Sequence, residues 1–373
     1  MVLRCMWFAL LIVGVSSCSS NQPMQREARQ AVEDMFAPRY SIVFVIHGDG
    51  DYLYHDANGG EHNANEEALA GARRVALQNP HAEVFIFHQQ PSTHFLFFFP
   101  RHDGEFSYYQ NGRLIITESY WRDMEGSHLN SELQLYHDFH VKTPADGVRM
   151  FLYYGHEIPE FDGTGYDASR SDRKFTVQDL ATGLERFNDQ SAKFDLLVLS
   201  TCFGGTPYTI ATLGPSARYI IASPDNLHLS YFDAHSLERL DQQLRNDDVS
   251  AYVESFAHHA FDRLTADIQT AVSVAVYDVN RVQGFLRSVR EHYGMTLNTL
   301  SGNAQSPLVN NSRCDCADLQ AYSLPTMSEG VKVFYRPARF GRATKKQEHS
   351  GWECWRERNL QGATLQTQKS NAR

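Results

Sequence analysis

The chain has 373 residues, of which 42% are apolar and 12% aromatic, enough to bury the cores of one large or two ordinary domains. This composition excludes a mainly disordered chain, and the presence of only one short apolar run excludes a polytopic membrane protein. Lys and Arg number 34 against 44 Asp and Glu, which gives a net charge of -10 with no basic block. We therefore expect no nucleic-acid partner.

The first 17 residues have the pattern of an export signal. Arg4 precedes an apolar run, residues 6–15, which is too short to cross a bilayer as a helix. Small residues then lead to Cys18, and a polar stretch that starts at Ser19 follows it. This arrangement resembles the lipobox of bacterial lipoproteins, in which cleavage leaves the cysteine as the lipidated first residue. The alternative is an ordinary signal peptide with an incidental cysteine.

The lipobox resemblance implies where the protein resides. Acyl chains on Cys18 would anchor it to a membrane of the bacterial cell envelope, and no other segment would need to enter lipid. Ser19, rather than Asp, follows the cysteine, and this implies sorting to the outer membrane.

Beyond residue 38 the chain alternates strand and helix patterns. Apolar, β-rich runs predict strands, stretches rich in Ala and Glu predict helices, and Asp-Gly and Asn-Gly pairs predict hairpin turns. In chain order the first half is expected to contain strand Ser41–Ile46, helix Asn65–Gln78, strand Glu83–His88, hairpin strands at Phe95–Phe99 and Leu114–Thr117, and helix Ser127–His140.

The second half continues the alternation. The expected elements are strand Val148–Tyr154, helix Val177–Phe187, strand Phe194–Ser200, helix Thr206–Leu213, strand Ala217–Ser223, helices Asp233–Leu244 and Ser250–Thr265, strand Ala271–Tyr277 and helix Val279–His292. Strands that alternate with helices in this way predict an α/β fold, with a mostly parallel sheet and helices on both faces.

Two of these strands end in residues suited to catalysis. Val148–Tyr154 is followed closely by His156, and Phe194–Ser200 is followed closely by Cys202. Sites of open α/β sheets lie at the carboxyl ends of strands, so we expect these two side chains to meet if the strands are neighbours. The imidazole would then take the thiol proton, and the thiolate would attack a carbonyl carbon.

Gly204 and Gly205 follow the cysteine. We expect them to leave room for a substrate backbone and to open a helix whose N-terminus favours negative charge. That field would lower the pKa of the thiol and, with the Cys202 backbone N–H, stabilise an oxyanion.

These motifs resemble the clostripain family, within the caspase–hemoglobinase group of cysteine peptidases. The matching segments resemble the strand that delivers the catalytic His, the strand that delivers the catalytic Cys and the strand after it, at residues 153–156, 194–202 and 217–223. Weaker similarity extends over residues 42–51 and 330–337. The resemblance implies a three-layer sandwich of the caspase–hemoglobinase kind. It also implies a cysteine endopeptidase that acts on proteins or peptides, with His156 as base and Cys202 as nucleophile.

These features predict that the chain is divided into four parts. Residues 1–17 are expected to be a lipoprotein signal peptide, 18–38 a tether, 39–340 a clostripain/caspase-like peptidase domain and 341–373 a polar C-terminal tail.

The chain departs from the family pattern at two positions. The family usually has Gly after the catalytic His, where the N–H contributes to the oxyanion hole, and this chain has Glu157. The family commonly has Asp two positions before the nucleophile, linked to selection of basic residues, and this chain has Ser200. Asp225 is a candidate substitute at the rim of the pocket.

Other clusters predict less chemistry. Cys354 is expected to form a disulfide with Cys314 or Cys316 in an oxidising compartment, and the sequence does not decide between them. Cys314 and Cys316 lack the second pair that a zinc site needs. A loop rich in His and Asp has no ligand spacing that confirms a metal, so none is expected at His47, Asp49, His55 and Asp56.

No phosphate loop and no nucleophile-elbow motif occurs in the sequence, so we expect no cofactor and no serine hydrolase. Two functions remain. The first is an envelope-anchored cysteine endopeptidase. The second is an inactive relative that binds peptides or proteins, a hypothesis that Glu157 and Ser200 favour.

Overall fold

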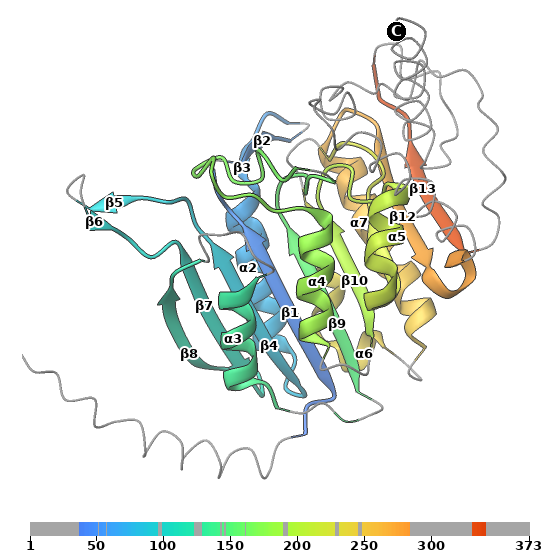
Figure 1. Ribbon diagram of the computed structural model, residues 1–373. Helices are drawn as coiled ribbons and strands as arrows, with labels where there is room; N and C mark the ends of the chain where they lie inside the picture. Colours follow the sequence, from blue (N-terminus) through green and yellow to red (C-terminus); the bar gives the residue numbers. More distant parts are fainter. Residues whose placement is uncertain are drawn as a thin grey trace, which may run out of the picture. The chain divides into compact units, whose positions relative to one another are not determined.

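The computed structural model describes residues 37–50, 52–56, 58–95, 99–122, 129–141, 144, 147–160, 162–188, 193–227, 231–244, 248–283 and 330–340. A nine-stranded sheet runs through this part of the chain (Figure 1). Its strands lie in the order β13 (Val331–Arg336), β12 (Val272–Asp278), β11 (Ala217–Ala222), β10 (Phe194–Ser200), β9 (Val148–Tyr154), β1 (Tyr40–His47), β4 (Ala82–Gln89), β7 (Gly104–Gln110) and β8 (Arg113–Tyr120).

The sheet is mostly parallel. The five central strands, from β11 to β4, pair in parallel, and β12 and β7 pair antiparallel on either side of them. Strands β13 and β8 are antiparallel to these two, so they return to the central direction and seven of the nine strands share it. The predicted α/β class with a mostly parallel sheet is confirmed.

The central strands are buried on both faces, as their sequences require. All eight residues of β1 are buried, and the strand has no alternation of polar and apolar positions. Parallel strands covered by helices on both sides have this near-continuous apolar pattern. Because almost all of their residues are buried, β1, β9 and β10 form the centre of the packed structure.

Helices cover both faces (Figure 1). One face packs against α2 (Ala64–Gln78), α6 (Leu240–Gln243) and α7 (Val249–Asp267). The other packs against α3 (Asn130–Phe139), α4 (Val177–Phe187) and α5 (Pro207–Leu213). The result is a three-layer sandwich in which the sheet separates two apolar cores.

The helix starts are specified locally. Asn63 caps α2 by accepting hydrogen bonds from the N–H groups of Asn65 and Glu66. Thr176 and Asp179 form a reciprocal capping box at the start of α4. These side chains satisfy backbone donors that the first turn of a helix leaves without partners.

A hairpin extends the sheet at one edge, as predicted from Asn111-Gly112. The strand predicted over Phe95–Phe99 is wrong, because Phe95 and Phe99 pair with each other in a separate small hairpin and Gly104 begins β7 rather than a turn. The turn between β7 and β8 has positive φ at both Asn111 and Gly112, the conformation of a two-residue hairpin turn. Two short hairpins lie outside the main sheet, β2 (Leu53–His55) with β3 (Glu61–Asn63) and β5 (His94–Phe95) with β6 (Phe99–Pro100).

The helix predicted over Asp233–Leu244 is wrong. The segment contains only a 3-10 turn, η2 (His235–Leu237), and the four-residue α6, separated by Arg239 with φ 57°. The Asn79 side chain donates to the Leu237 carbonyl at 2.8 Å and accepts from the Leu240 N–H at 2.7 Å. These tertiary hydrogen bonds replace the helical ones. A second short turn, η1 (Gly214–Ser216), leads into β11.

Two further predictions lie partly or wholly outside the described residues. A helix begins at Val279 as expected, and its described part ends at residue 283. The residues of the predicted signal, tether and C-terminal tail up to 36 and from 341 onward are outside the description, so these boundaries stay predictions.

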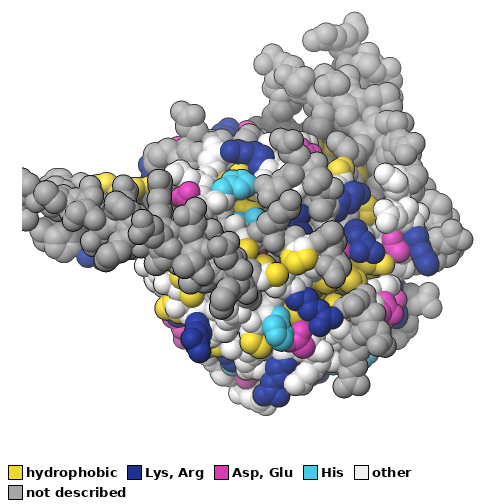
Figure 2. Space-filling view, turned by 90° about the horizontal axis from the view of Figure 1, so that it is seen from below, with side chains coloured by type: hydrophobic (Ala, Val, Ile, Leu, Met, Phe, Trp, Pro, Cys, Tyr) yellow, Lys and Arg dark blue, Asp and Glu magenta, His cyan; other side chains and the backbone are white. Residues whose placement is uncertain are grey.

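Ion pairs connect the segments that precede β1 and β4 to α6 at the amino-terminal edge of the sheet. Asp241 pairs with Arg39 at 3.4 Å and with His81 at 2.7 Å. Figure 2 views the molecule from this side and shows cationic, acidic and histidine side chains lying next to one another on the visible face.

A buried ionic cluster holds the chain between β9 and α4 against the opposite, carboxyl edge. The Asp167 carboxylate accepts from Arg122 at 2.9 Å and from Arg173 at 2.7 Å. Arg173 also reaches Asp103 at 2.7 Å. These four side chains are nearly or completely inaccessible, so each charge depends on its partners for compensation.

We predict that Asp167→Asn lowers the free energy of unfolding by about 3–5 kcal/mol, because two buried guanidinium groups lose their shared carboxylate. The measurement is urea denaturation of the purified protein. Asp172→Asn is the matched control, because its carboxylate is 69% exposed and pairs with Arg170 at 3.5 Å. It should change stability by less than about 1 kcal/mol. Equal effects of the two substitutions would contradict the stabilising role of the cluster.

Candidate active site

The ends of β9 and β10 bring the two predicted catalytic residues to one place. Tyr154 and Ser200 are register partners in parallel strands, and the Gly155 N–H donates to the Ser200 carbonyl at 3.4 Å. His156 and Cys202 each lie two residues beyond this pair. Because paired strands lie about 4.8 Å apart, the two residues emerge side by side at the carboxyl edge.

His156 is half-buried against an aromatic ring. The centroid of the Tyr52 ring lies 4.4 Å from that of the imidazole, with the two planes at 76°. Burial lowers the pKa of His156, and the nearby Asp49 carboxylate opposes this only in part. The imidazole is therefore held neutral near pH 7, in the state that accepts a proton.

The Cys202 side chain is partly exposed and forms no disulfide. Its thiol donates to the Asn226 side-chain oxygen at 3.2 Å, and its sulfur accepts from the Leu227 N–H at 3.4 Å. The N–H stabilises a thiolate, whereas the bond to Asn226 stabilises the protonated thiol. Phe203, directly after the cysteine, has φ 54°, which marks a sharp turn of the kind often found at functional sites.

Asp225 lies in the loop that faces this turn. Its backbone oxygen accepts from the Phe203 N–H at 3.1 Å and from the Ser223 hydroxyl at 2.9 Å. Its carboxylate accepts from the Asn226 N–H at 2.8 Å. Asp225 thus shapes the loop that holds the Cys202 sulfur, and a contact with substrate stays a prediction.

The predicted contact of Ser200 with substrate needs correction. The residue is completely buried, and its hydroxyl accepts from the Phe232 N–H at 2.7 Å. Ser200 therefore holds the segment that follows β11 against the sheet. The position where the clostripain family commonly has Asp is used here for an interior hydrogen bond.

The two glycines also have a different role from the predicted one. An added Cβ on Gly205 would lie 2.8 Å from the Pro224 nitrogen, and one on Gly204 would lie 2.6 Å from the Thr201 hydroxyl oxygen. The space beside them is filled by protein, so they allow close packing rather than room for a substrate. Helix α5 starts later, at Pro207, and its first turn is capped by Thr206.

Of the remaining predicted site residues, Glu157 is among the described residues and the four cysteines are not. Glu157 follows His156 and is half-buried, and its effect on an oxyanion stays a prediction. The residues predicted for lipidation and for a disulfide lie outside the described residues: Cys18, Cys314, Cys316 and Cys354.

The loop rich in His and Asp is not assembled as a metal site. Buried His47 lies near Asp49, whereas exposed His55 pairs with Glu61 at 3.8 Å on the β2–β3 hairpin. Asp56 accepts from the N–H groups of its own turn. Among the described residues no group of three or more His, Cys, Asp or Glu side chains is arranged to hold a metal.

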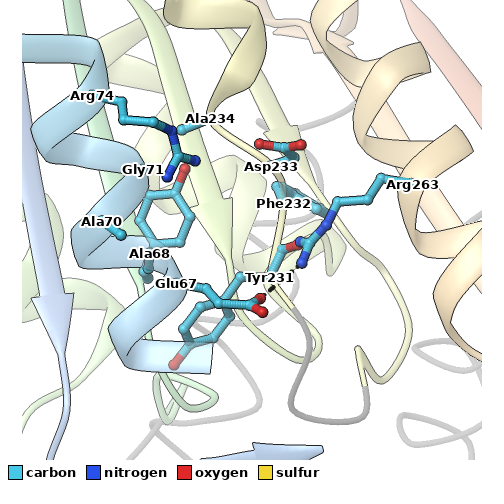
Figure 3. Close-up of a pocket in the computed structure, with 11 residues that line it drawn as sticks. Glu67, Ala68, Ala70, Gly71, Arg74, Tyr231, Phe232, Asp233, Ala234 and Arg263 are labelled. Atoms are coloured by element: carbon cyan, nitrogen blue, oxygen red, sulfur yellow. Dashed lines mark hydrogen bonds and ion pairs between the residues drawn. The ribbon is translucent and has the colours of Figure 1, made fainter. Parts of the chain in front are cut away.

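A cavity of about 300 Å³ lies beside β9, on the face of the sheet that carries α2 and α7 (Figure 3). Arg263 and Glu67 form an ion pair of 2.9 Å at its side, and Arg74 and Asp233 also line it. Tyr154 lines the cavity too, and its buried hydroxyl has no hydrogen-bond partner within the described structure. The cavity thus adjoins the strand that leads to His156.

Sequence reasoning missed two residues of the site. Tyr52 contacts His156 from the end of the loop after β1, and Asn226 contacts Cys202 from the loop after β11. Asn226 stands next to Asp225 beyond a predicted strand end, a position that gives a usable signal. For Tyr52 the sequence gives no signal, because its contact depends on how the loop folds back.

The class of protein follows from a family comparison. Residues 152–326 match the model of the clostripain family, and this segment contains His156 and Cys202. The chain is clostripain-like over this segment, and its class is that of cysteine-type peptidases. No curated protein matches the chain.

Solved structures show a more distant similarity. A secreted C11 cysteine protease from Bacteroides thetaiotaomicron, in complex with an irreversible peptide inhibitor, has 12% identity and a TM-score of 0.47, covering 68% of this chain and 69% of that chain. An inactive zymogen C11 protease from Parabacteroides distasonis has 13% identity and a TM-score of 0.44, covering 86% and 81%. The class assignment rests on the family match.

Across the described residues, no helix is long and apolar enough to span a membrane.

We predict that Gly205→Ala lowers the free energy of unfolding by about 1–3 kcal/mol, because its Cβ meets backbone atoms that cannot move independently. Those atoms are the Pro224 nitrogen at 2.8 Å and the Ser223 carbonyl carbon at 2.9 Å. The control is Gly50→Ala, where no atom lies within 4 Å of the added Cβ. Thermal unfolding of both variants gives the comparison, and an unchanged Gly205→Ala protein would refute the packing role.

Proposed function

We propose that the chain is a cysteine endopeptidase in which Cys202 is the nucleophile and His156 the general base. The observation that supports the proposal is the parallel register of Tyr154 with Ser200. Because of this register, the chain segments that carry His156 and Cys202 leave the sheet at the same edge. The neutral imidazole and the partly exposed thiol have the states that this chemistry needs.

The reaction proceeds in two steps. His156 takes the thiol proton, the sulfur attacks the carbonyl carbon, and the C–N bond breaks as the imidazolium returns that proton to the leaving amine. Water, deprotonated by His156, then hydrolyses the thioester and restores the thiol. The backbone N–H of Cys202 is the candidate donor to the oxyanion.

We predict that the full-length chain, under reducing conditions, cleaves peptides of a mixed library and that Cys202→Ala and His156→Ala each lower the rate by at least about a hundred-fold. New termini are read by mass spectrometry. Cys354→Ala, which removes a thiol far from His156 in the sequence, is the control for general loss of cysteine. Cleavage that persists without Cys202 would exclude the proposed nucleophile.

A second function is favoured by the bond between the Cys202 thiol and Asn226. This bond holds the proton on sulfur, and Glu157 follows the base directly. We infer that an inactive, peptide- or protein-binding role is the alternative if the library shows no cleavage and Cys202 resists alkylation.

We predict that Glu157→Gly raises kcat by about five-fold, the effect of roughly 1 kcal/mol on the barrier, if the carboxylate repels the developing oxyanion. Glu157→Gln removes the charge without freeing the backbone, so it should recover most of the gain. Steady-state kinetics on a substrate from the library measures both. An unchanged or lower kcat in both variants would remove this explanation.

We also propose that the protein is anchored to the bacterial envelope through lipid on Cys18, at the outer membrane. The support is the sequence pattern alone: a short apolar run, small residues before the cysteine and a polar stretch after it. An anchored peptidase would act on proteins or peptides that reach the membrane surface.

A further inference from the structure

The ring of Tyr52 packs edge-on against the imidazole of His156. The two centroids lie 4.4 Å apart, with the planes at 76°. Tyr52 is only 2% exposed, and its carbonyl accepts from the Ala64 N–H at 2.9 Å at the start of α2. Its backbone and ring are therefore both fixed, and the ring restricts rotation of the imidazole.

The hydroxyl of Tyr52 is held by a buried carboxylate. It donates to one oxygen of Asp49, and the other oxygen accepts from the Ala168 N–H. His47 lies 3.5 Å from Asp49. Burial alone would raise the pKa of Asp49, but the interactions with His47, the Ala168 N–H and His156 together outweigh it, so the pKa lies below its ordinary value. Asp49 is therefore an anion within the site.

This anion acts on the base. The Asp49 carboxylate stabilises the imidazolium form of His156 against the effect of burial. His47, at the end of β1, opposes the effect of Asp49 and lowers the pKa of His156. Other ionisable groups of this edge are Cys202 after β10, Glu157 next to His156 in the chain and Tyr231 after β11. Burial, with the charges of Asp49 and Cys202, raises the pKa of Tyr231, so that phenol stays neutral. Tyr52 links the imidazole to this buried anion, because its ring contacts His156 and its hydroxyl donates to Asp49.

We propose that Tyr52, anchored by Asp49, is a positioning residue that orients His156 toward Cys202. The inference rests on the proposed dyad and extends it to the end of β1. The ring sets the plane of the imidazole, and the hydroxyl bond keeps the ring in place. The Asp49 charge supports the imidazolium that forms when the thiol gives up its proton.

The test measures the reactivity of Cys202 beside His156, and it needs no peptide substrate. The full-length, reduced protein is treated with iodoacetamide from pH 5 to 10, and the rate of Cys202 alkylation is followed by mass spectrometry of its peptide. An oriented imidazole makes Cys202 reactive well below the ordinary thiol pKa of about 8.5. The variants are Tyr52→Leu, which removes the ring, Tyr52→Phe, which keeps the ring and loses the hydroxyl, and Asp49→Asn.

We predict that Tyr52→Leu lowers the alkylation rate at pH 6 by about ten-fold, since a thiol whose apparent pKa rises by one unit has one tenth of the thiolate. Tyr52→Phe and Asp49→Asn should each lower it by about three-fold, with the same shift to higher pH. These two conservative variants carry the test if Tyr52→Leu does not fold, as judged by near-UV circular dichroism.

Tyr54→Phe is the matched control. Tyr54 lies two residues further along, is also buried, and donates its hydroxyl to Glu67 at 2.8 Å. It should leave the alkylation profile unchanged. A folded Tyr52→Leu protein with the wild-type profile would overturn the inference while leaving the dyad intact, provided that His156→Ala shifts the profile. A profile that His156→Ala also leaves unchanged would overturn the dyad and this inference with it.

Discussion

The in-register pairing of β9 with β10 is the contact on which the proposed site depends. Both strands are buried on both faces, and their side chains alternate between the two cores. Tyr154 and Ser200 oppose each other, and His156 and Cys202 each follow two residues later in the chain. A slip of one residue would turn one of the two toward the other core. The apolar packing that fixes the register therefore also fixes where the two strand ends place His156 and Cys202.

A buried polar layer supports the same edge from the other face of the sheet. His47 contacts Gln89 at 2.8 Å and the Tyr166 carbonyl at 3.0 Å, and Arg122 joins His47 to Asp167. Burying these groups carries a desolvation cost that only their mutual contacts offset. The layer ties the end of β1 to the chain that follows His156. His156, the proposed base, thus follows a strand whose neighbour is held by buried polar contacts, as precise positioning requires.

Sequence reasoning succeeded where a pattern has a local cause. Strands such as Phe194–Ser200 were predictable because continuous apolar runs between turn residues have few other structures available. The placement of His156 and Cys202 at one edge was also predictable, because carboxyl ends of neighbouring parallel strands meet there. It failed over Asp233–Leu244, where Asn79, from a distant part of the chain, supplies the hydrogen bonds that a helix would have made.

The sequence by itself determined the α/β class, the main strands, and the candidates His156 and Cys202, because hydrophobic periodicity and strand-end motifs act over short distances along the chain. Only the tertiary structure decided what surrounds them. It buried Ser200 beneath Phe232, packed Gly205 against Pro224, and placed Tyr52 against His156. These contacts join segments far apart in the sequence. Their formation depends on how the loops at the carboxyl edge pack together, which no short stretch of sequence encodes.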